Sequence, residues 1–382
     1  MILMAIDHVR VYSGLPAGGP TPGIFFTRWV THFCAPAFLF LAGTSAFLSL
    51  HNRPPSPRSG EGARGRGKSL LFRGAWLILL ELTVLRVAWT FNVDFAHYAM
   101  AGVIWAIGWC MILMAGLVAL RPAVVGMIGL VIMAGHNLLD GTLGGSGGAL
   151  WSILYAGFWA GPIRFGDGGP SLIVLYSIVP WIGVMAAGYG FGALLVLGPA
   201  RRNRICLTIG LGATALFLLL RGFNLYGDPR PWTAMTEARP DGPPPMPSVL
   251  AFLNTSKYPA SLLFLLMTLG PTVALIPLLE RAGGAVSRWI TVFGKVSFFY
   301  YVLHIPLIHA LALVVSKIRL GHVSPWLSAN HPMGNPPPPD GYTWSLPLLY
   351  LVFAAAILIL YFPCRWFADL KARSNDWWLR YL

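Results

Sequence analysis

The chain has 382 residues, of which 56% are hydrophobic and only 10% are charged, and its mean hydropathy is +0.66. Soluble globular domains carry about 25% charged residues, so this composition excludes an ordinary water-soluble protein and is typical of a polytopic membrane protein. The 27 Lys and Arg outnumber the 13 Asp and Glu, which gives a net charge of +14. Such an excess can indicate a nucleic-acid partner, a basic tail or a topology signal, and the positions of the charges decide among these.

Long apolar runs predict the transmembrane helices, because a helix needs about 20 mostly apolar residues to cross a bilayer. Only six apolar residues precede Asp7, so we expect a first helix that is truncated at its N-terminus. Full spans are expected at 27–50, 71–91, 101–120, 122–139, 171–197, 205–221, 258–279, 289–316 and 345–363. We therefore predict an all-α polytopic membrane protein with about ten transmembrane helices (range nine to eleven), forming a single domain over 1–382.

The distribution of charge orients these spans. Segment 51–73 is rich in Arg, Gly and Pro, which indicates a disordered cytoplasmic loop. Alternation of the spans then puts four more segments on that side, namely 121, 200–204, 280–295 and 364–382. Together the five segments hold 17 Lys and Arg against 4 acids, and the rest of the chain holds 10 against 9. Nearly all of the net charge thus records orientation, with the loop and the C-terminus cytoplasmic in a bacterial inner membrane, and we expect no nucleic-acid partner.

The positions of the cysteines and histidines limit the kinds of site that the chain can form. Cys34, Cys110, Cys206 and Cys364 lie inside or at the ends of apolar runs, without a CxxC or Cys/His cluster, so we expect neither disulfides nor a metal site. P-loop, HExxH and GxSxG motifs are also missing from the sequence. Only His51 falls on the cytoplasmic side. The other eight histidines fall in outer halves or outer loops: His8, His32, His97, His136, His304, His309, His322 and His331.

Ionisable groups inside spans are costly and usually face a cavity or a partner, so they are the first functional candidates. His8, near the end of the first helix, can act as a general base because the ordinary pKa of histidine is near 6.5. Asp7 or another carboxylate would orient it. His304 lies mid-span, with Tyr301 three residues earlier on the same face, and is a second catalytic candidate. The alternatives are a polar cluster at a helix end and a structural histidine.

Further polar residues gather at the expected outer ends of the spans. Arg28 and His32 are four apart and share a helix face. With Tyr301 they are candidate substrate contacts, and the other candidates are His136, Asp140, Arg221, Tyr226, Asp228, Lys257 and Tyr258. Converging donors and acceptors suit sugar hydroxyls, whereas helix caps and snorkelling side chains are the alternative. Glu81 and Arg86 are five apart, so each is expected to pair with another helix.

Several stretches, in this order, resemble a known family: MILMAIDHVR, FTRWVTHFCAPAFLFLAGTSAFL, GVIWAIGWCMILMA, GHNLLD, LRGFNLYGDPRPW and VFGKVSFFYYVLHIPLIH. The chain resembles the bacterial branch of the heparan-α-glucosaminide N-acetyltransferase catalytic-domain family, most strongly over 1–222. His8 matches a histidine found near the end of the first helix in the wider superfamily of membrane acyltransferases. The lysosomal heparan enzymes carry their catalytic histidine in the following loop, and residues 11–26 here contain none, so that role is not carried over.

The resemblance implies an acyl-CoA-dependent acyltransferase. Such an enzyme moves an acyl group, usually acetyl, from cytoplasmic acetyl-CoA to a sugar amine or hydroxyl on the outer side, so the acceptor here would be a cell-envelope or imported glycan. Cytoplasmic-side cations would hold the phosphates of the donor, and on charge alone the candidates are Arg121, Arg201, Arg202, Arg288 and Lys295.

Two other functions stay open at this point. A transporter or flippase for a sugar or lipid-linked sugar also uses charged groups inside the membrane, although the sequence shows no repeated halves. A regulatory or scaffolding membrane protein is the third alternative. The expected partners are the lipid bilayer, acyl-CoA and a glycan acceptor, and a homodimer is an alternative to the monomer.

Overall fold

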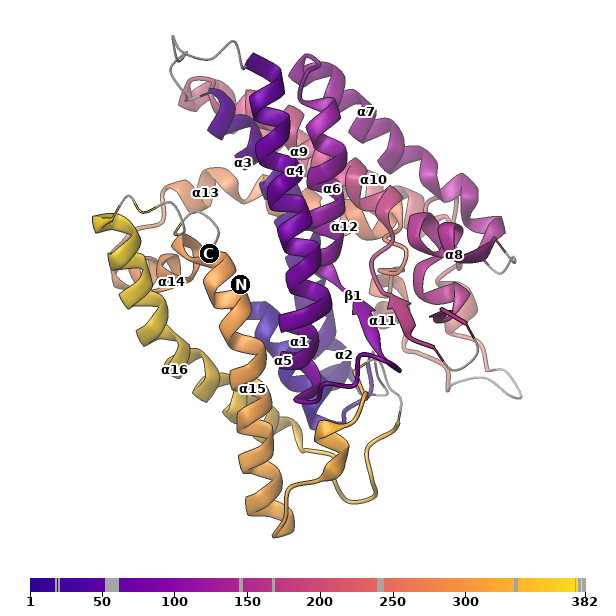
Figure 1. The fold of residues 1–382 in the computed structure, drawn as a ribbon. Coiled ribbons are helices and arrows are strands. Elements are labelled where there is room, and N and C mark those ends of the chain that lie inside the picture. Colours follow the sequence, from indigo (N-terminus) through magenta and orange to yellow (C-terminus); the bar gives the residue numbers. More distant parts are fainter. Residues whose placement is uncertain are drawn as a thin grey trace. The chain divides into compact units, whose positions relative to one another are not determined.

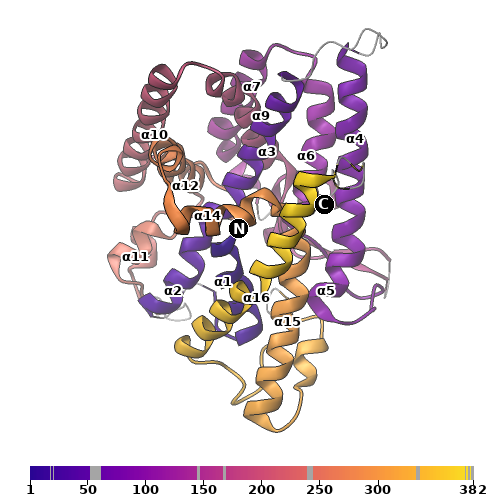
Figure 2. The same ribbon diagram turned by 90° about the vertical axis from the view of Figure 1, so that its left-hand side faces the viewer.

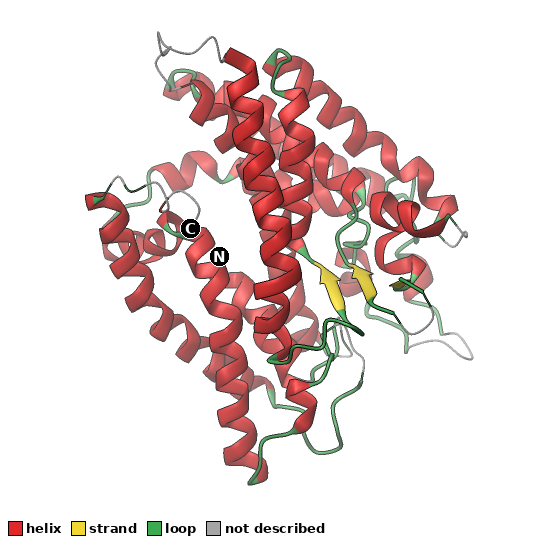
Figure 3. Ribbon diagram, viewed as in Figure 1, coloured by secondary structure: helices red, strands yellow, loops and turns green. Residues whose placement is uncertain are grey.

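The computed structural model describes residues 1–17, 19, 21–51, 62–143, 147–166, 169–238, 244–332, 336–374, 376 and 379. Most of these residues are helical (Figure 3). The chain forms two compact units. Unit 1 comprises Met1–Cys34, Thr83–Asp94 and Arg281–Leu382, and unit 2 comprises Ala35–Leu82 and Phe95–Glu280.

Unit 1 is built on three helices that contact one another (Figures 1 and 2): α1 (Ile2–Ser13), α15 (Ser297–Leu320) and α16 (Leu346–Arg373). Its shorter elements are α2 (Pro22–Trp29), the 3₁₀ turn η1 (Val30–Phe33), α5 (Arg86–Thr90), α14 (Gly284–Lys295) and the 3₁₀ turn η7 (Pro325–Ser328). The facing sides of α1 and α15 carry His8 and His304 of the candidate site.

The end of α1 is fastened to the segment between α15 and α16. Gly14 ends α1 in the left-handed conformation, with φ of 74°, which glycine adopts without steric cost. The backbone N–H of Trp344 then donates to the carbonyl oxygen of Ser13 at 2.9 Å. The hydroxyl of Tyr342 donates to the carbonyl oxygen of Tyr12 at 2.8 Å. These bonds join the chain's first helix to a loop more than 300 residues later and hold the loop over the histidines.

Unit 2 contains most of the remaining helices. Its long elements are α3 (Cys34–His51, which begins at the last residue of unit 1), α4 (Gly62–Leu80), α6 (Val103–Leu117), α7 (Pro122–Gly135), α9 (Ile178–Leu195), α10 (Pro199–Gly222) and α12 (Leu262–Ala274). Shorter helices and turns are η2 (Glu81–Leu85, π-helical, which passes into unit 1 at Thr83), η3 (His136–Thr142), α8 (Gly148–Trp151), η4 (Ser152–Ala156), η5 (Gly157–Ala160), η6 (Thr233–Met235), α11 (Ser248–Leu253) and α13 (Ile276–Glu280). Strands β1 (Ala99–Ala101), β2 (Ile163–Arg164) and β3 (Ser171–Val174) form a small sheet with order β1-β3-β2, parallel and then antiparallel.

Facing glycines let the helices of unit 2 approach closely. A Cβ added to Gly108 of α6 would lie 2.6 Å from the carbonyl oxygen of Gly74 of α4, and one on Gly190 of α9 would lie 2.6 Å from the Cα of Gly126 of α7. In lipid, where helices gain little from hydrophobic burial against one another, such close backbone contact is a main source of association. The glycine content of the spans is therefore part of the packing of this unit.

The prediction of an all-α polytopic membrane protein is confirmed. Among the described residues, seven helices are long and apolar enough to cross a membrane, and Val103–Leu117 and Gly148–Ala160 are shorter apolar helices. Each full span expected from the sequence falls on one or more described helical elements, and α1 covers Ile2–Ser13.

Three boundaries expected from the sequence are wrong. Residues 171–174 form β3 and are not the start of a span, because α9 begins at Ile178. The run 289–316 is two helices, since Val296 leaves helical geometry (φ −128°, ψ 43°) between α14 and α15. Residues 62–73 of the supposed disordered loop belong to α4, and 52–61 lie outside the described residues.

Candidate functional site

The candidate site in unit 1 is built on two histidines that are 296 residues apart in the sequence. Nδ1 of His8 on α1 lies 2.6 Å from Nε2 of His304 on α15, and the two rings stack with centroids 4.8 Å apart. His304 is buried and His8 is half-buried. Two imidazole nitrogens at this distance share a hydrogen bond, so the fold brings together both histidines named above as catalytic candidates.

The backbone of α15 determines which nitrogen of each ring carries a proton. Nδ1 of His304 lies 2.6 Å from the carbonyl oxygen of Tyr301 and 3.1 Å from that of Tyr300. Carbonyl oxygens only accept, so Nδ1 of the neutral His304 donates and its Nε2 accepts. Nδ1 of His8 then donates to this Nε2, which places the lone pair of the neutral His8 ring on its own Nε2. The assignment follows from the hydrogen-bond network.

Asp7 takes a different partner from His8. Its Oδ1 accepts a hydrogen bond from Nε of Arg10 at 2.8 Å, and Arg10 also donates to the carbonyl oxygen of Leu15 at 3.0 Å. Consecutive residues of a helix point about 100° apart, which is why the two neighbours diverge. For His8, the structure shows an orienting hydrogen bond to His304.

Aromatic rings continue from this pair toward the C-terminal end of α1. The Trp89 ring lies edge-on to His8 at 4.8 Å and stacks with Tyr12 at 5.9 Å. Tyr12, one turn after His8, stacks with His309 of α15 at 4.6 Å. The Tyr12 hydroxyl donates to the carbonyl oxygen of Trp89 at 2.8 Å, which fixes the two rings against each other. His309 is buried, and its Nδ1 lies 3.2 Å from the carbonyl oxygen of Ala88.

A fourth histidine joins these rings from the loop between α15 and α16. His331 is only 2% exposed; its ring lies 5.6 Å from that of Tyr12 and 4.0 Å from that of Trp326. We call His8, His304, His309 and His331 the histidine column.

Arg86, at the start of α5, holds the loop that carries His331. The buried guanidinium donates to side-chain oxygens of Asn92 at 2.6 Å and Asn330 at 3.3 Å. Asn330 in turn donates to Asp94 at 2.9 Å. Arg86 thus has partners other than Glu81, as expected from their spacing. Glu81 itself accepts from the backbone N–H of Ile104 in unit 2 at 3.1 Å.

Stability will fall in acid because of His331. Burial, followed by the charge of His309, lowers the pKa of His331 to about 3, against about 6.5 in an unfolded chain. Between these values the unfolded chain binds a proton that the folded chain does not. His331 therefore contributes stability above pH 6.5 that is lost as the pH falls toward 3, at up to about 1.4 kcal/mol per pH unit. Apparent Tm of the detergent-purified chain, measured from pH 4 to pH 8, will fall less steeply in His331→Phe than in the wild type. Curves of apparent Tm against pH that are equally steep in the wild type and in His331→Phe would contradict the assignment of the acid sensitivity to His331.

In unit 2, the predicted contacts Arg221 and Asp228 form a buried ion pair. Their charged atoms are 3.7 Å apart and their side chains are 1% and 4% exposed. Asp228 also accepts from the backbone N–H of Ser256 at 2.8 Å and from the hydroxyl of Ser261 at 3.0 Å. Burial raises the pKa of Asp228, and Arg221 and these hydrogen bonds work in the opposite direction. The guanidinium donates to four backbone carbonyls, those of Arg230, Ala251, Phe252 and Asn254. The pair therefore organises the segment that follows α10.

His136 and Asp140 come together through Tyr155, which no pattern in the sequence marks. The hydroxyl of Tyr155 donates to Oδ1 of Asp140 at 2.6 Å and lies 3.4 Å from Nδ1 of His136. Asn137 donates to the other carboxylate oxygen at 2.8 Å and accepts from the backbone N–H of Leu262 at 2.8 Å. This chain of bonds ties η3 to η4 and to the start of α12.

The remaining predicted substrate contacts are more scattered. The hydroxyl of Tyr226 donates to the carbonyl oxygen of Ala134 at 2.7 Å. The buried Lys257 ammonium lies 5.1 Å from the ring centre of Tyr258 and 5.9 Å from that of Tyr176, within cation–π range. In unit 1, His32 is buried in η1 and Arg28 is half-buried at the end of α2.

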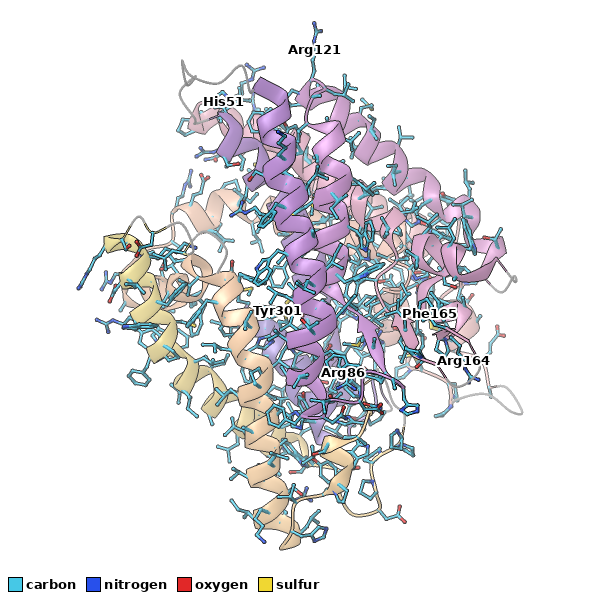
Figure 4. The ribbon with its side chains drawn as sticks, in the orientation of Figure 1. His51, Arg86, Arg121, Arg164, Phe165 and Tyr301 are labelled. Atoms are coloured by element: carbon cyan, nitrogen blue, oxygen red, sulfur yellow. The ribbon has the colours of Figure 1, made fainter. Side chains whose placement is uncertain are left out.

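The proposed donor-binding cations divide between the two units. Arg121 projects from the start of α7, at the same end of unit 2 as His51 (Figure 4). Arg201 and Arg202 begin α10, where Arg202 pairs with Glu280 at 2.6 Å. Arg288 and Lys295 are exposed on α14 of unit 1. The described residues contain no group of three or more His, Cys, Asp or Glu that could hold a metal ion.

Tyr12 and Trp89 were not singled out from the sequence, and His309 and His331 were named there only among the eight outer histidines. Tyr12 lies four residues after His8, a spacing that puts both on one face of α1, so its place was readable once His8 was chosen. Trp89, His309 and His331 reach the site through pairings between distant segments, which no local pattern shows.

The family of the chain follows from comparison with known proteins. No curated protein matches it. A family model, described as heparan-alpha-glucosaminide N-acetyltransferase, catalytic, matches residues 1–225, more than half of the chain. The matched region contains His8, Tyr12 and Trp89, together with His136, Asp140 and Arg221. The protein is an integral membrane protein of acetyltransferase type, and it belongs to the heparan-alpha-glucosaminide N-acetyltransferase catalytic-domain family.

Proposed function

We propose that the protein transfers an acetyl group from cytoplasmic acetyl-CoA to a hydroxyl or amine of a sugar on the outer side of a bacterial inner membrane, with its basic loop and C-terminus cytoplasmic. The observation that carries the proposal is the 2.6 Å contact between His8 and His304, with Nδ1 of His304 held by a backbone carbonyl. This arrangement leaves Nε2 of His8 as the proton acceptor. Family membership supports the acetyl-transfer chemistry, and the separation of charge along the chain supports the orientation.

In the proposed reaction, the oxygen or nitrogen of the sugar acceptor attacks the thioester carbonyl. Nε2 of His8 takes the proton from that hydroxyl or amine during the attack. A C–O or C–N bond forms, the C–S bond breaks, and the proton passes to the departing thiolate. His304 is a positioning residue, since it orients the His8 ring and accepts from its Nδ1–H in both charge states. General-base catalysis of this kind contributes about 10²–10⁴-fold.

The polar networks of unit 2 are proposed to serve the acceptor, and the cations Arg121, Arg201, Arg202, Arg288 and Lys295 to serve the phosphates of the donor. Arg202 is the least suited of these, because Glu280 already balances its charge. The same Nε2 could also carry the acetyl group covalently. Incubation with acetyl-CoA labelled in its acetyl group, without acceptor, separates the two routes, since only the covalent route labels the protein.

Removal of His304 will slow transfer without abolishing it. In His304→Phe the ring of His8 is free to adopt either tautomer, so kcat will fall by about 10–100-fold, less than the full contribution of a general base. The pH dependence of kcat will also shift, because His8 loses the acceptor of its Nδ1–H. His304→Gln, which keeps a hydrogen-bonding group, will recover part of the rate. If His304→Phe has the same kcat and the same pH profile as the wild type, His304 is merely structural.

The rival function is a transporter or flippase without acyl transfer. Acetyl-CoA will raise the Tm of the detergent-purified chain if the protein is the proposed enzyme, because a ligand that binds only the folded state stabilises it. Sugar uptake by proteoliposomes that lack acetyl-CoA, together with no effect of acetyl-CoA on Tm, would favour the transporter instead.

A further inference from the structure

Two histidines of the column have ring nitrogens without a hydrogen-bond partner. Nε2 of His309 and both ring nitrogens of His331 are buried and unpaired in the described structure. The side chains of these residues are 0% and 2% exposed. Buried polar atoms are nearly always hydrogen-bonded, and each exception requires an explanation, such as a bound molecule. Neither ring is used by the proposed acetyl transfer.

The hydrogen bonds that do exist define what these nitrogens can bind. Nδ1 of His309 lies 3.2 Å from the carbonyl oxygen of Ala88 and donates to it, which leaves Nε2 without a proton; the carbonyl oxygen of Leu327 also lies close to this ring. His331 is neutral at physiological pH, with one nitrogen donating and the other accepting. The pair thus offers two acceptors and one donor, without a full charge. A hydroxyl group, which both donates and accepts, is complementary to this set.

The pair also lies at a suitable distance from the reacting nitrogen. Tyr12 contacts both rings and follows His8 by four residues of α1, a rise of about 6 Å. Trp89 contacts His8 and Tyr12 and supplies an aromatic surface between the two levels. A sugar ring spans a comparable distance, so one hydroxyl or amine can lie at His8 while another reaches His309.

We propose that His309 and His331 form a subsite for a neutral hydroxyl group of the sugar acceptor, one helical turn beyond the His8–His304 pair. The role of this sugar as the acetyl acceptor rests on the proposed function, whereas the binding of a neutral sugar at the two histidines does not. His331 lies on the loop between α15 and α16, so this loop covers the bound hydroxyl.

Chemical protection of the wild-type chain tests the subsite without any substitution. Diethyl pyrocarbonate acylates unprotonated imidazole nitrogens, and mass spectrometry of peptides locates the modified histidines. D-glucose, D-galactose and N-acetylglucosamine, none of which has a free amine that would consume the reagent, are added in turn at 100 mM. The reagent reaches the buried His309 and His331 only by the opening that would admit the sugar, so at least one sugar will slow their modification by threefold or more. The exposed His322, on the same loop, is the internal control and will be modified at an unchanged rate.

Two variants provide the second measurement. The protective sugar will raise the Tm of the wild type and of His322→Phe, and will raise it by less than half as much in His309→Phe and His331→Phe. Monodisperse elution and wild-type helicity verify that the variants fold. Protection without acetyl transfer would support the subsite and overturn the proposed function. Acetyl transfer without protection by any of the sugars would overturn the subsite alone, and protection by Zn²⁺ in place of sugar would overturn it in favour of a metal site.

Discussion

Replacement of His8 by Ala will lower kcat for acetyl transfer by about 10²–10⁴-fold, the usual contribution of a general base. The loss follows from the hydrogen bonds of the pair. His304 directs Nδ1–H of His8 toward itself and leaves Nε2 as the nitrogen that accepts a proton. Single-turnover acetyl transfer to a sugar acceptor, measured with detergent-purified protein, gives the rate of the chemical step separately from product release.

Two controls make the result specific. His322→Ala removes an exposed histidine and will keep the wild-type rate. Asp7→Asn tests whether the neighbouring carboxylate contributes, and because Asp7 bonds Arg10, we expect an effect smaller than that of His304→Phe. Full acetyl transfer by a well-folded His8→Ala protein would contradict the assignment of His8 as the base.

The transmembrane helices could be predicted from the sequence because the bilayer imposes a simple rule on it. A spanning segment must be helical and apolar over its length, so α7, α10 and α15 are visible as runs of hydropathy. The rule does not predict whether one apolar stretch forms a single helix or two helices. Residues 289–295 are as compatible with a continuous helix as with the separate α14, and no feature of the apolar pattern marks the break at Val296.

The candidate site was predictable only in part, for the same reason. His8 and His304 attract notice because each is a polar residue in an apolar helix. Their pairing could not be predicted, since it depends on which helices are neighbours, and α1 and α15 are separated by most of the chain. Asp7 and His8 are adjacent in sequence but point about 100° apart on the helix, so the role of Asp7 in orienting His8 stays a prediction.

The buried pair of Arg221 and Asp228 will determine the stability of unit 2 more than any exposed pair. Arg221→Met leaves the carboxylate of Asp228 buried without its counter-charge, and four backbone carbonyls lose their donor. Breaking a buried pair by removal of one partner costs about 3–5 kcal/mol. We therefore expect the apparent Tm to fall by on the order of 10 °C.

Arg202→Met is the matched control, because Arg202 lies on the same helix and is also paired with an acid. Its distance to Glu280 is shorter, 2.6 Å against 3.7 Å, but the side chains are 21% and 38% exposed. Exposed pairs contribute about 0–1 kcal/mol, so this variant will lower Tm by only about 3 °C or less. Burial, and not distance, thus sets the expected order of the two variants.

The double variant Arg221→Met/Asp228→Asn separates charge from packing. If the uncompensated carboxylate causes the loss, neutralising it will restore part of the stability that Arg221→Met removes, because the amide oxygen can still accept from Ser256 and Ser261. If Arg221 instead contacts the acceptor directly, its replacement will raise KM and leave Tm close to the wild-type value. A fall in Tm with an unchanged KM in the folded fraction would place Arg221 among the residues that hold the loop after α10 in position.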